Sequence, residues 1–238
     1  MKFVFLSLFL LFVQSHEPSL DDLLGKVSPG SDPTFLKISD SFARGDQYLR
    51  KEASLAFEEM ARAALKDGVK IIAISTTRNF NRQKQIWNAK WTGKRLVQGK
   101  NLAETSLSDS AKAMEILKYS SMPGTSRHHW GSDVDINALE NDWFEAGEGK
   151  KIYEWMQKHA EEYGFCQPYT SKECGRTGYE EEKWHWSYEP ISKPYLEAYL
   201  SKVKTEMITG FEGAHTAKEV QVIENYVQGI THCNLHEN

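Results

Sequence analysis

Apolar residues recur at helical and strand-like intervals along most of this chain, and the intervals predict its elements. One helix face runs from Ala53 to Ala64, and Gly68 follows where a C-terminal cap belongs. The β-branched run over residues 69–75 predicts a strand, and residues 80–91 then predict a helix. The first third of the chain therefore indicates a helix–strand–helix order.

The same two periods continue through the second half of the chain. In the strand predicted over 184–188, alternation places His185 on the face opposite Trp184 and Trp186. The further elements that we predict are a helix over 107–118, a strand over 134–136, a helix over 152–163 ended by Gly164, a strand over 184–188 and one amphipathic helix over 216–230.

The first 35 residues have a different character. Met1 and Lys2 precede an apolar run over 3–13, which is typical of a secretory signal peptide (1–15) cleaved after Ser15. The alternative is a retained membrane anchor, but the run is shorter than the roughly 20 residues that span a bilayer. Residues 16–35 are polar and contain proline and glycine, so they predict a leader or linker.

From these features we expect three further properties of the mature chain. Residues 36–203 would form the main domain, and residues 204–238 would be a C-terminal helical extension. The signal predicts a secreted, periplasmic or cell-envelope protein without integral membrane contact after cleavage. The net charge of −4 and the lack of a Lys/Arg cluster argue against nucleic acid as a partner.

Export also bears on the three cysteines. In an oxidising compartment, Cys166 and Cys174 are predicted to form a disulfide. They could instead be metal ligands, although their spacing lacks the usual C-x-x-C pattern. Cys233 is left without an assignment.

Two short segments together contain the side chains of a catalytic zinc site. Residues 126–135 supply His128 and Asp135, and residues 182–185 supply His185 and a spare carboxylate, Glu182. Two imidazoles, one carboxylate, an open position and a nearby base are the parts of a hydrolytic zinc centre. His128 and Asp135 converge only if the chain bends between them, and Gly131 permits such a bend.

The remaining polar candidates flank these segments. Glu182 is the predicted general base, and Glu181 replaces it if the turn before the last strand is offset by one residue. Arg78 follows a predicted strand, from which it could stabilise an oxyanion or bind a substrate carboxylate.

Three motifs resemble those of the zinc D-alanyl-D-alanine carboxypeptidases and dipeptidases of the vancomycin-resistance type. The resemblance covers residues from about 49 to 188. The matching positions are Ser126, His128, Gly131 and Asp135 in the first motif, Glu182, Trp184 and His185 in the second, and Ser75, Arg78 and Gln83 upstream.

The resemblance implies an α+β fold, in which helices surround a small, mostly antiparallel sheet like that of lysostaphin-type peptidases and the hedgehog domain. It implies zinc bound by His128, Asp135 and His185, with Glu182 as the base. It further implies that the protein removes the terminal D-alanine from peptidoglycan stem peptides or short D-Ala-terminated peptides. The residues that would contact substrate are Arg78, Gln83 and Ser126.

Several alternatives remain open at this point. The bond cut could be that of an L,D-carboxypeptidase, a D,D-dipeptidase or an endopeptidase, or the domain could bind cell-wall peptides without turnover. The chain departs from the family at His129, a possible extra ligand or a hydrogen-bond donor behind the ligands, and at Ser187, which could alter substrate preference. A lysostaphin-like register through His129 and Asp133 fails, because Lys183 stands where its partner histidine belongs.

Overall fold

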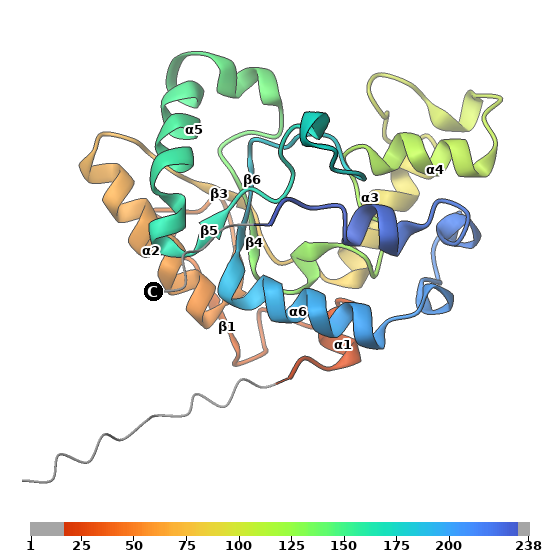
Figure 1. The fold of residues 1–238 in the computed structure, drawn as a ribbon, viewed down its shortest axis with the longest axis horizontal. Coiled ribbons are helices and arrows are strands. Elements are labelled where there is room, and N and C mark those ends of the chain that lie inside the picture. The colour runs from red at the N-terminus through yellow and green to blue at the C-terminus, as the bar shows by residue number, and fades with distance from the viewer. Residues whose placement is uncertain (1–16, 233–238) are drawn as a thin grey trace, which may run out of the picture.

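The computed structural model describes residues 17–232, so the predicted signal peptide and Cys233 lie outside the described part. A four-stranded antiparallel sheet in the order β3-β4-β6-β5 occupies the centre of the molecule (Figure 1). A separate antiparallel pair, β1-β2, lies beside the helix α2 (Lys51–Lys66). The strands are β1 (Phe35–Lys37), β2 (Tyr48–Arg50), β3 (Ala73–Ser75), β4 (Asp133–Ile136), β5 (Phe165–Cys166) and β6 (His185–Tyr188).

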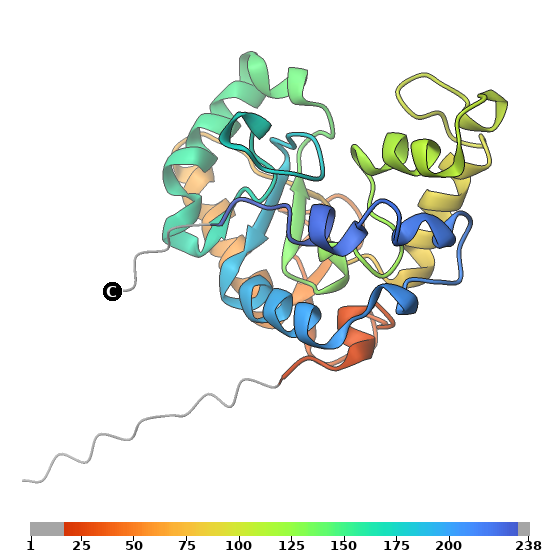
Figure 2. The same ribbon diagram turned by 45° about the vertical axis from the view of Figure 1, so that its right-hand side comes forward.

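Helices surround this sheet on several sides (Figures 1 and 2). α2 and α5 lie at one end of the molecule, α3 and α4 lie at the other, and α6 packs beside α1. The arrangement confirms the predicted α+β class with a small antiparallel sheet. The helices are α1 (Leu20–Leu23), α2 (Lys51–Lys66), α3 (Phe80–Trp91), α4 (Asp109–Leu117), α5 (Gly147–His159) and α6 (Glu189–Lys202).

The strand predicted over 69–75 is shorter in the structure. Only β3 pairs with β4, and this pairing is itself irregular, because the register shifts between Ala73 and Ser75. Just before this shift, the backbone N–H of Ile72 donates to the side chain of Asn137 rather than to a strand neighbour. The β-branched composition therefore marks the strand correctly but overestimates its length.

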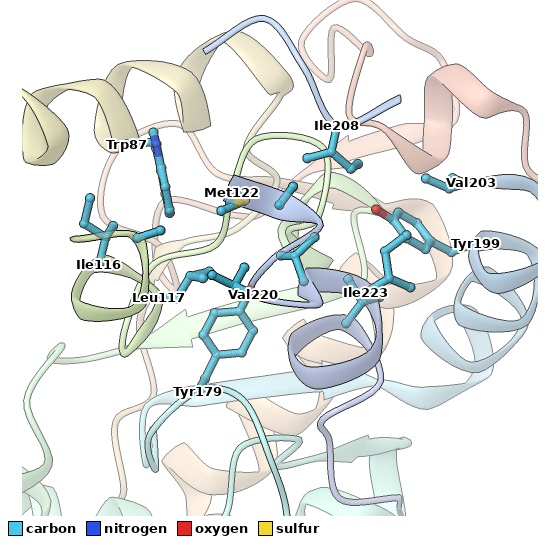
Figure 3. Packing of buried hydrophobic residues seen from close by; sticks show 14 of the residues in the cluster. Trp87, Ile116, Leu117, Met122, Tyr179, Tyr199, Val203, Ile208, Val220 and Ile223 are labelled. Atoms are coloured by element: carbon cyan, nitrogen blue, oxygen red, sulfur yellow. The ribbon is translucent and has the colours of Figure 1, made fainter. Parts of the chain in front are cut away.

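The prediction of a single helix over 216–230 is wrong. The segment forms a 3-10 turn, Ala214–Ala217, and a π-helical turn, Ile223–Val227. Gln221 separates them with a φ of 49°, which interrupts regular helix. Apolar side chains of this segment are still buried, and Figure 3 shows Val220 and Ile223 among them.

The segment 16–35, expected as a leader or linker, contacts the rest of the chain where it is described. Leu23 in α1 is fully buried, and its carbonyl accepts a hydrogen bond from the indole N–H of Trp130 (3.3 Å). Asp22 pairs with Arg50 at 2.5 Å. These contacts fix the segment against β2 and the turn before β4. The domain boundaries at 35 and 203 remain predictions.

Two clusters of buried apolar side chains form the core. One joins α2 and α5 to the sheet and includes Phe57, Met156 and Phe165. The other joins α3, α4, α6 and the C-terminal segment, and it includes Trp87 and Tyr199 (Figure 3). The predicted pairing of Cys166 with Cys174 stays a prediction, because the side chain of Cys174 lies outside the described part.

Gly131 provides the bend that the first metal motif requires. Its φ is +76°, and a Cβ there would lie 2.6 Å from the Phe35 ring. Gly99 has a φ of +78° with no atom near the corresponding position. We expect Gly131→Ala to lower the free energy of unfolding by about 1–3 kcal/mol more than Gly99→Ala does, because only Gly131→Ala adds a steric clash.

Urea unfolding of the two variants measures this difference. Equal losses of stability would contradict the inferred close approach of Phe35 to Gly131.

Candidate metal centre

His128, Asp135 and His185 converge on one point in the centre of the sheet. Each offers a ligand atom, and these atoms lie within 4.8 Å of one another. The register of the sheet explains part of this geometry, because Asp135 in β4 lies directly opposite His185 in β6. The bend at Gly131 brings His128, which lies in the 3-10 turn before it, to the same point.

The hydrogen bonds of His128 direct one ring nitrogen at the centre. Nδ1 lies 2.7 Å from the carbonyl oxygen of Thr76, so Nδ1 carries the proton and donates. Nε2 then presents a lone pair, 3.3 Å from Oδ1 of Asp135. Both of these atoms are buried, and neither has a hydrogen-bond partner within the described residues. A cation between them would satisfy both.

His185 is oriented in the opposite sense. Its Nε2 lies 2.8 Å from Asp133, which leaves Nδ1 directed at the centre, 3.1 Å from Asp135 Oδ1 and 3.4 Å from Glu182 Oε2. A carboxylate that holds the outer nitrogen of a ligating histidine is the usual support of such a ligand. Asp133 supplies that support here.

The electrostatics of the centre favour a cation. Burial lowers the pKa of His128, which keeps the imidazole neutral as a ligand must be. Burial also acts to lower the pKa of His185, but Asp133, Asp135 and Glu182 outweigh it and raise that pKa well above its usual value. The two nitrogens and one carboxylate oxygen suit zinc. The residues present therefore fit the metal that the sequence predicts.

Glu182 lies at the edge of the centre, in the turn that precedes β6. The backbone N–H of His185 donates to the carbonyl of Glu182 at 3.2 Å, and this contact closes the turn. The side chain is buried, which raises its pKa above the usual value for a glutamate. Glu181 does not line the cavity at the centre, so the offset that would have made it the base is absent.

Asp133 belongs to a buried network that sequence reasoning missed. Its carboxylate accepts hydrogen bonds from Arg127 Nε (3.1 Å), Ser187 Oγ (2.8 Å) and Ser132 Oγ (2.5 Å). Arg127 also donates to Ser187 at 2.7 Å. The signal was present, because strand alternation places Asp133 on the same face as Asp135. In the sequence, Asp133 is a candidate only as a ligand in the lysostaphin-like register, which fails.

A cavity of about 640 Å³ opens onto the centre, and Glu182 and Ser126 contribute to its walls. The guanidinium of Arg78 also lines it, 3.4 Å from Asp135 and 3.1 Å from Ser75 Oγ. Gln83 lies outside the wall and donates to the carbonyl of Ser121 at 2.8 Å.

The two loops that follow α3 and β5 complete the cavity. They supply Arg95, Gln98, Tyr169 and Tyr179. Ser187 is buried away from the cavity and contacts Asp133 instead. The C-terminal segment packs behind the cavity, where Tyr226 contacts the ring of Tyr179 (5.2 Å between centroids).

His129 takes no part in the metal cluster. Its Nε2 accepts from the backbone N–H of Gly124 (3.0 Å), and its Nδ1 therefore donates to the carbonyl of Arg78 (2.5 Å). Of its two expected roles, the structure supports that of a donor behind the site, because His129 holds the backbone of Arg78. Burial lowers its pKa to about 3.

This buried histidine predicts a pH dependence of stability. Between pH about 6.5 and 3 the unfolded chain binds a proton at His129 that the folded chain does not, so stability falls as the pH falls. From pH 7 to pH 5 we expect the wild type to lose about 2 kcal/mol more than His129→Gln. Urea unfolding with a chelator present measures the loss of stability of each protein. Equal losses in the wild type and in His129→Gln would contradict a neutral buried His129.

Residues 46–191 match the family VanY, D-alanyl-D-alanine carboxypeptidase, and the match covers more than half of the chain. The chain belongs to the VanY family. Putative carboxypeptidase YodJ of Bacillus subtilis (strain 168) is 34% identical over 193 residues, which are 74% of this chain and 64% of that protein. A D-alanyl-D-alanine carboxypeptidase of Enterococcus faecalis is 31% identical over 62% of this chain and 53% of its own length. The chain thus spans less than two thirds of the length of these two relatives.

Two solved structures extend the VanY-family comparison to three dimensions. A mutant of the vancomycin resistance D,D-pentapeptidase VanY in complex with Zn(II) is 27% identical, with a TM-score of 0.51, and the match covers 73% of this chain and 93% of that one. The LD-carboxypeptidase LdcB is 26% identical, with a TM-score of 0.50, over 73% of this chain and 79% of that one.

Between residues 17 and 232, none of the helices combines the length and the apolar character that a bilayer-spanning helix needs.

Proposed function

We propose that this VanY-family protein is a zinc peptidase that removes the terminal D-alanine from peptidoglycan stem peptides or related D-Ala-terminated peptides. One observation carries the proposal. The buried cluster of His128, Asp135 and His185 opens into a cavity that also contains a carboxylate, Glu182, with a raised pKa. A purely structural metal site needs neither the cavity nor the extra carboxylate.

The three converging side chains would hold the zinc ion, through Nε2 of His128, Nδ1 of His185 and Oδ1 of Asp135. A bound zinc ion would polarise a substrate carbonyl and lower the pKa of a coordinated water toward about 7. Asp133 fixes the ring of His185, and the Thr76 carbonyl fixes the ring of His128. The chain therefore holds both imidazoles in place through their outer nitrogens.

Glu182 would take a proton from the attacking water and return it to the leaving amine. Its burial supports this role, because burial raises the pKa of the carboxyl above the usual glutamate value, in the direction that suits a general base. Arg78 would bind the negative charge of the substrate, with Ser126 beside it on the cavity wall. Gln83 would act indirectly, since it holds the backbone of Ser121.

The location and partners follow from the same proposal. Stem peptides lie outside the cytoplasmic membrane, and the predicted signal peptide would bring the domain there as a secreted or cell-envelope protein. We expect the cavity to take the end of a peptide rather than nucleic acid.

The bond that is cut is tested by product mass analysis. Muropeptides that end in D-Ala-D-Ala and those that end in a single D-Ala after an L-centre are incubated with the zinc-loaded protein. We expect a loss of one alanine from the first substrate only. Loss of one alanine from the second would instead support an L,D-carboxypeptidase, the activity named for the LdcB structure.

A further inference from the structure

We propose that Lys90 and Arg95 form a second anion-binding subsite in the cavity, which takes a side-chain carboxylate of the peptide substrate. This subsite is separate from Arg78 and the metal cluster. The inference rests on the proposed peptidase function, and it adds that the substrate carries a second carboxylate besides its C-terminal one.

A row of side chains along α3 carries the argument. Arg82, Ile86 and Lys90 all line the cavity. They follow one another at intervals of four residues, so they lie on one face of the helix. Arg95, in the loop after α3, lines the same cavity beyond Lys90. The cavity wall is therefore cationic from Arg78 near the metal cluster to Arg95 in the loop.

Among residues 17–232, no carboxylate forms an ion pair with Arg82, Lys90 or Arg95. The Nζ of Lys90 donates only to a neutral group, Ser120 Oγ, at 2.5 Å. Arg78, by contrast, lies 3.4 Å from Asp135.

Lys90 is in addition partly desolvated. Burial, followed by the nearby charges of Arg95 and Arg78, lowers its pKa to about 8, and the more weakly acting charge of Glu182 only partly offsets this. A cation in such surroundings is unfavourable unless an anion is present. A carboxylate bound between Lys90 and Arg95 would remove both the repulsion and the unpaired charge.

The length of the row predicts where that carboxylate sits in the substrate. The eight residues from Arg82 to Lys90 span about 12 Å along the helix axis, at about 1.5 Å per residue. An extended peptide covers this distance in three to four residues, at about 3.3–3.6 Å each. With the terminal carboxylate at the Arg78 end of the row, two residue steps and an extended acidic side chain cover this distance, so we place the acid on the third residue from the C-terminus.

Matched peptides test this subsite. The probes are acetyl-Xaa-D-Ala-D-Ala, in which Xaa is glutamate or the longer 2-aminopimelate, each compared with its uncharged side-chain amide. We expect the zinc-loaded wild type to favour the better-fitting acid over its amide by about ten-fold or more in kcat/KM, the effect of one charge-assisted hydrogen bond. Lys90→Met should bring this ratio close to one.

Lys84 provides the control, because it lies on the same helix but outside this cavity. Lys84→Met should keep the preference for the acid, and Lys90→Arg should restore most of it. The subsite is overturned if the wild type treats acids and amides alike at both lengths, or if Lys90→Met keeps the preference.

Failure of the peptidase function gives a different result. In that case no peptide is hydrolysed, and calorimetric binding of the same four peptides to the zinc-loaded protein measures the acid-to-amide ratio instead. Tighter binding of an acid that depends on Lys90 supports the subsite, and equal binding overturns it.

Discussion

Glu182→Gln is expected to lower kcat for release of the terminal D-alanine by a factor of about 100 to 10,000, the usual contribution of a general base. Glutamine keeps the size of the side chain but cannot accept the proton of the attacking water. Because Glu182 lies beside the cluster rather than within it, the variant should still bind one zinc ion. Hydrolysis of a D-Ala-D-Ala peptide, with zinc measured on the same sample, checks both parts.

Glu181→Gln is the matched control for this experiment. Glu181 is adjacent in sequence but does not line the cavity. Its replacement should change kcat less than about two-fold, as expected for a carboxylate that contacts no reacting group. The assignment of the base is wrong if the two variants lose activity equally, or if Glu182→Gln remains fully active.

Asp133→Asn is expected to weaken zinc binding by about 10- to 100-fold, although Asp133 is not itself a proposed ligand. The fully buried carboxylate holds Nε2 of His185 and also neutralises the guanidinium of Arg127. Its loss leaves a buried arginine without a charged partner, which costs about 3–5 kcal/mol of folding free energy. Zinc competition with a chelator and urea unfolding measure the two effects separately.

Asp46→Asn is the control for a carboxylate of the same type at the surface. Asp46 pairs with Lys37 at 2.8 Å, and its side chain is 72% exposed. Exposed pairs contribute at most about 1 kcal/mol, so this variant should keep both its stability and its zinc affinity. An Asp133→Asn protein that behaves like Asp46→Asn would contradict the proposed role of the buried network.

Local patterns located most of the helices and strands but not always their extent or regularity. α3 occupies the predicted residues 80–91, because a helix is specified by its own spacing and Asn79 caps it. β3 is shorter than predicted, since its extent depends on pairing with β4, which lies some 60 residues later in the chain. The segment 216–230 carried the correct apolar residues, but close packing under the loop of residues 170–179 replaced its regular helix.

The converging side chains of the site were predictable because their motifs impose the convergence. Strand alternation and the bend at Gly131 bring His128, Asp135 and His185 together, and both features can be inferred from the sequence. The support by Asp133 depends on which ring nitrogen of His185 faces inward, and only the three-dimensional register shows this. The burial of Ser187 beside Arg127 likewise follows from cross-strand packing.

The most direct test of the account is a zinc titration of the metal-free protein during hydrolysis of a peptide that ends in D-Ala-D-Ala. We predict that D-alanine release is absent without metal, rises in proportion to added zinc and stops rising at one equivalent per chain. Release of D-alanine without metal would contradict the account. So would a protein that binds one equivalent of zinc and releases no D-alanine.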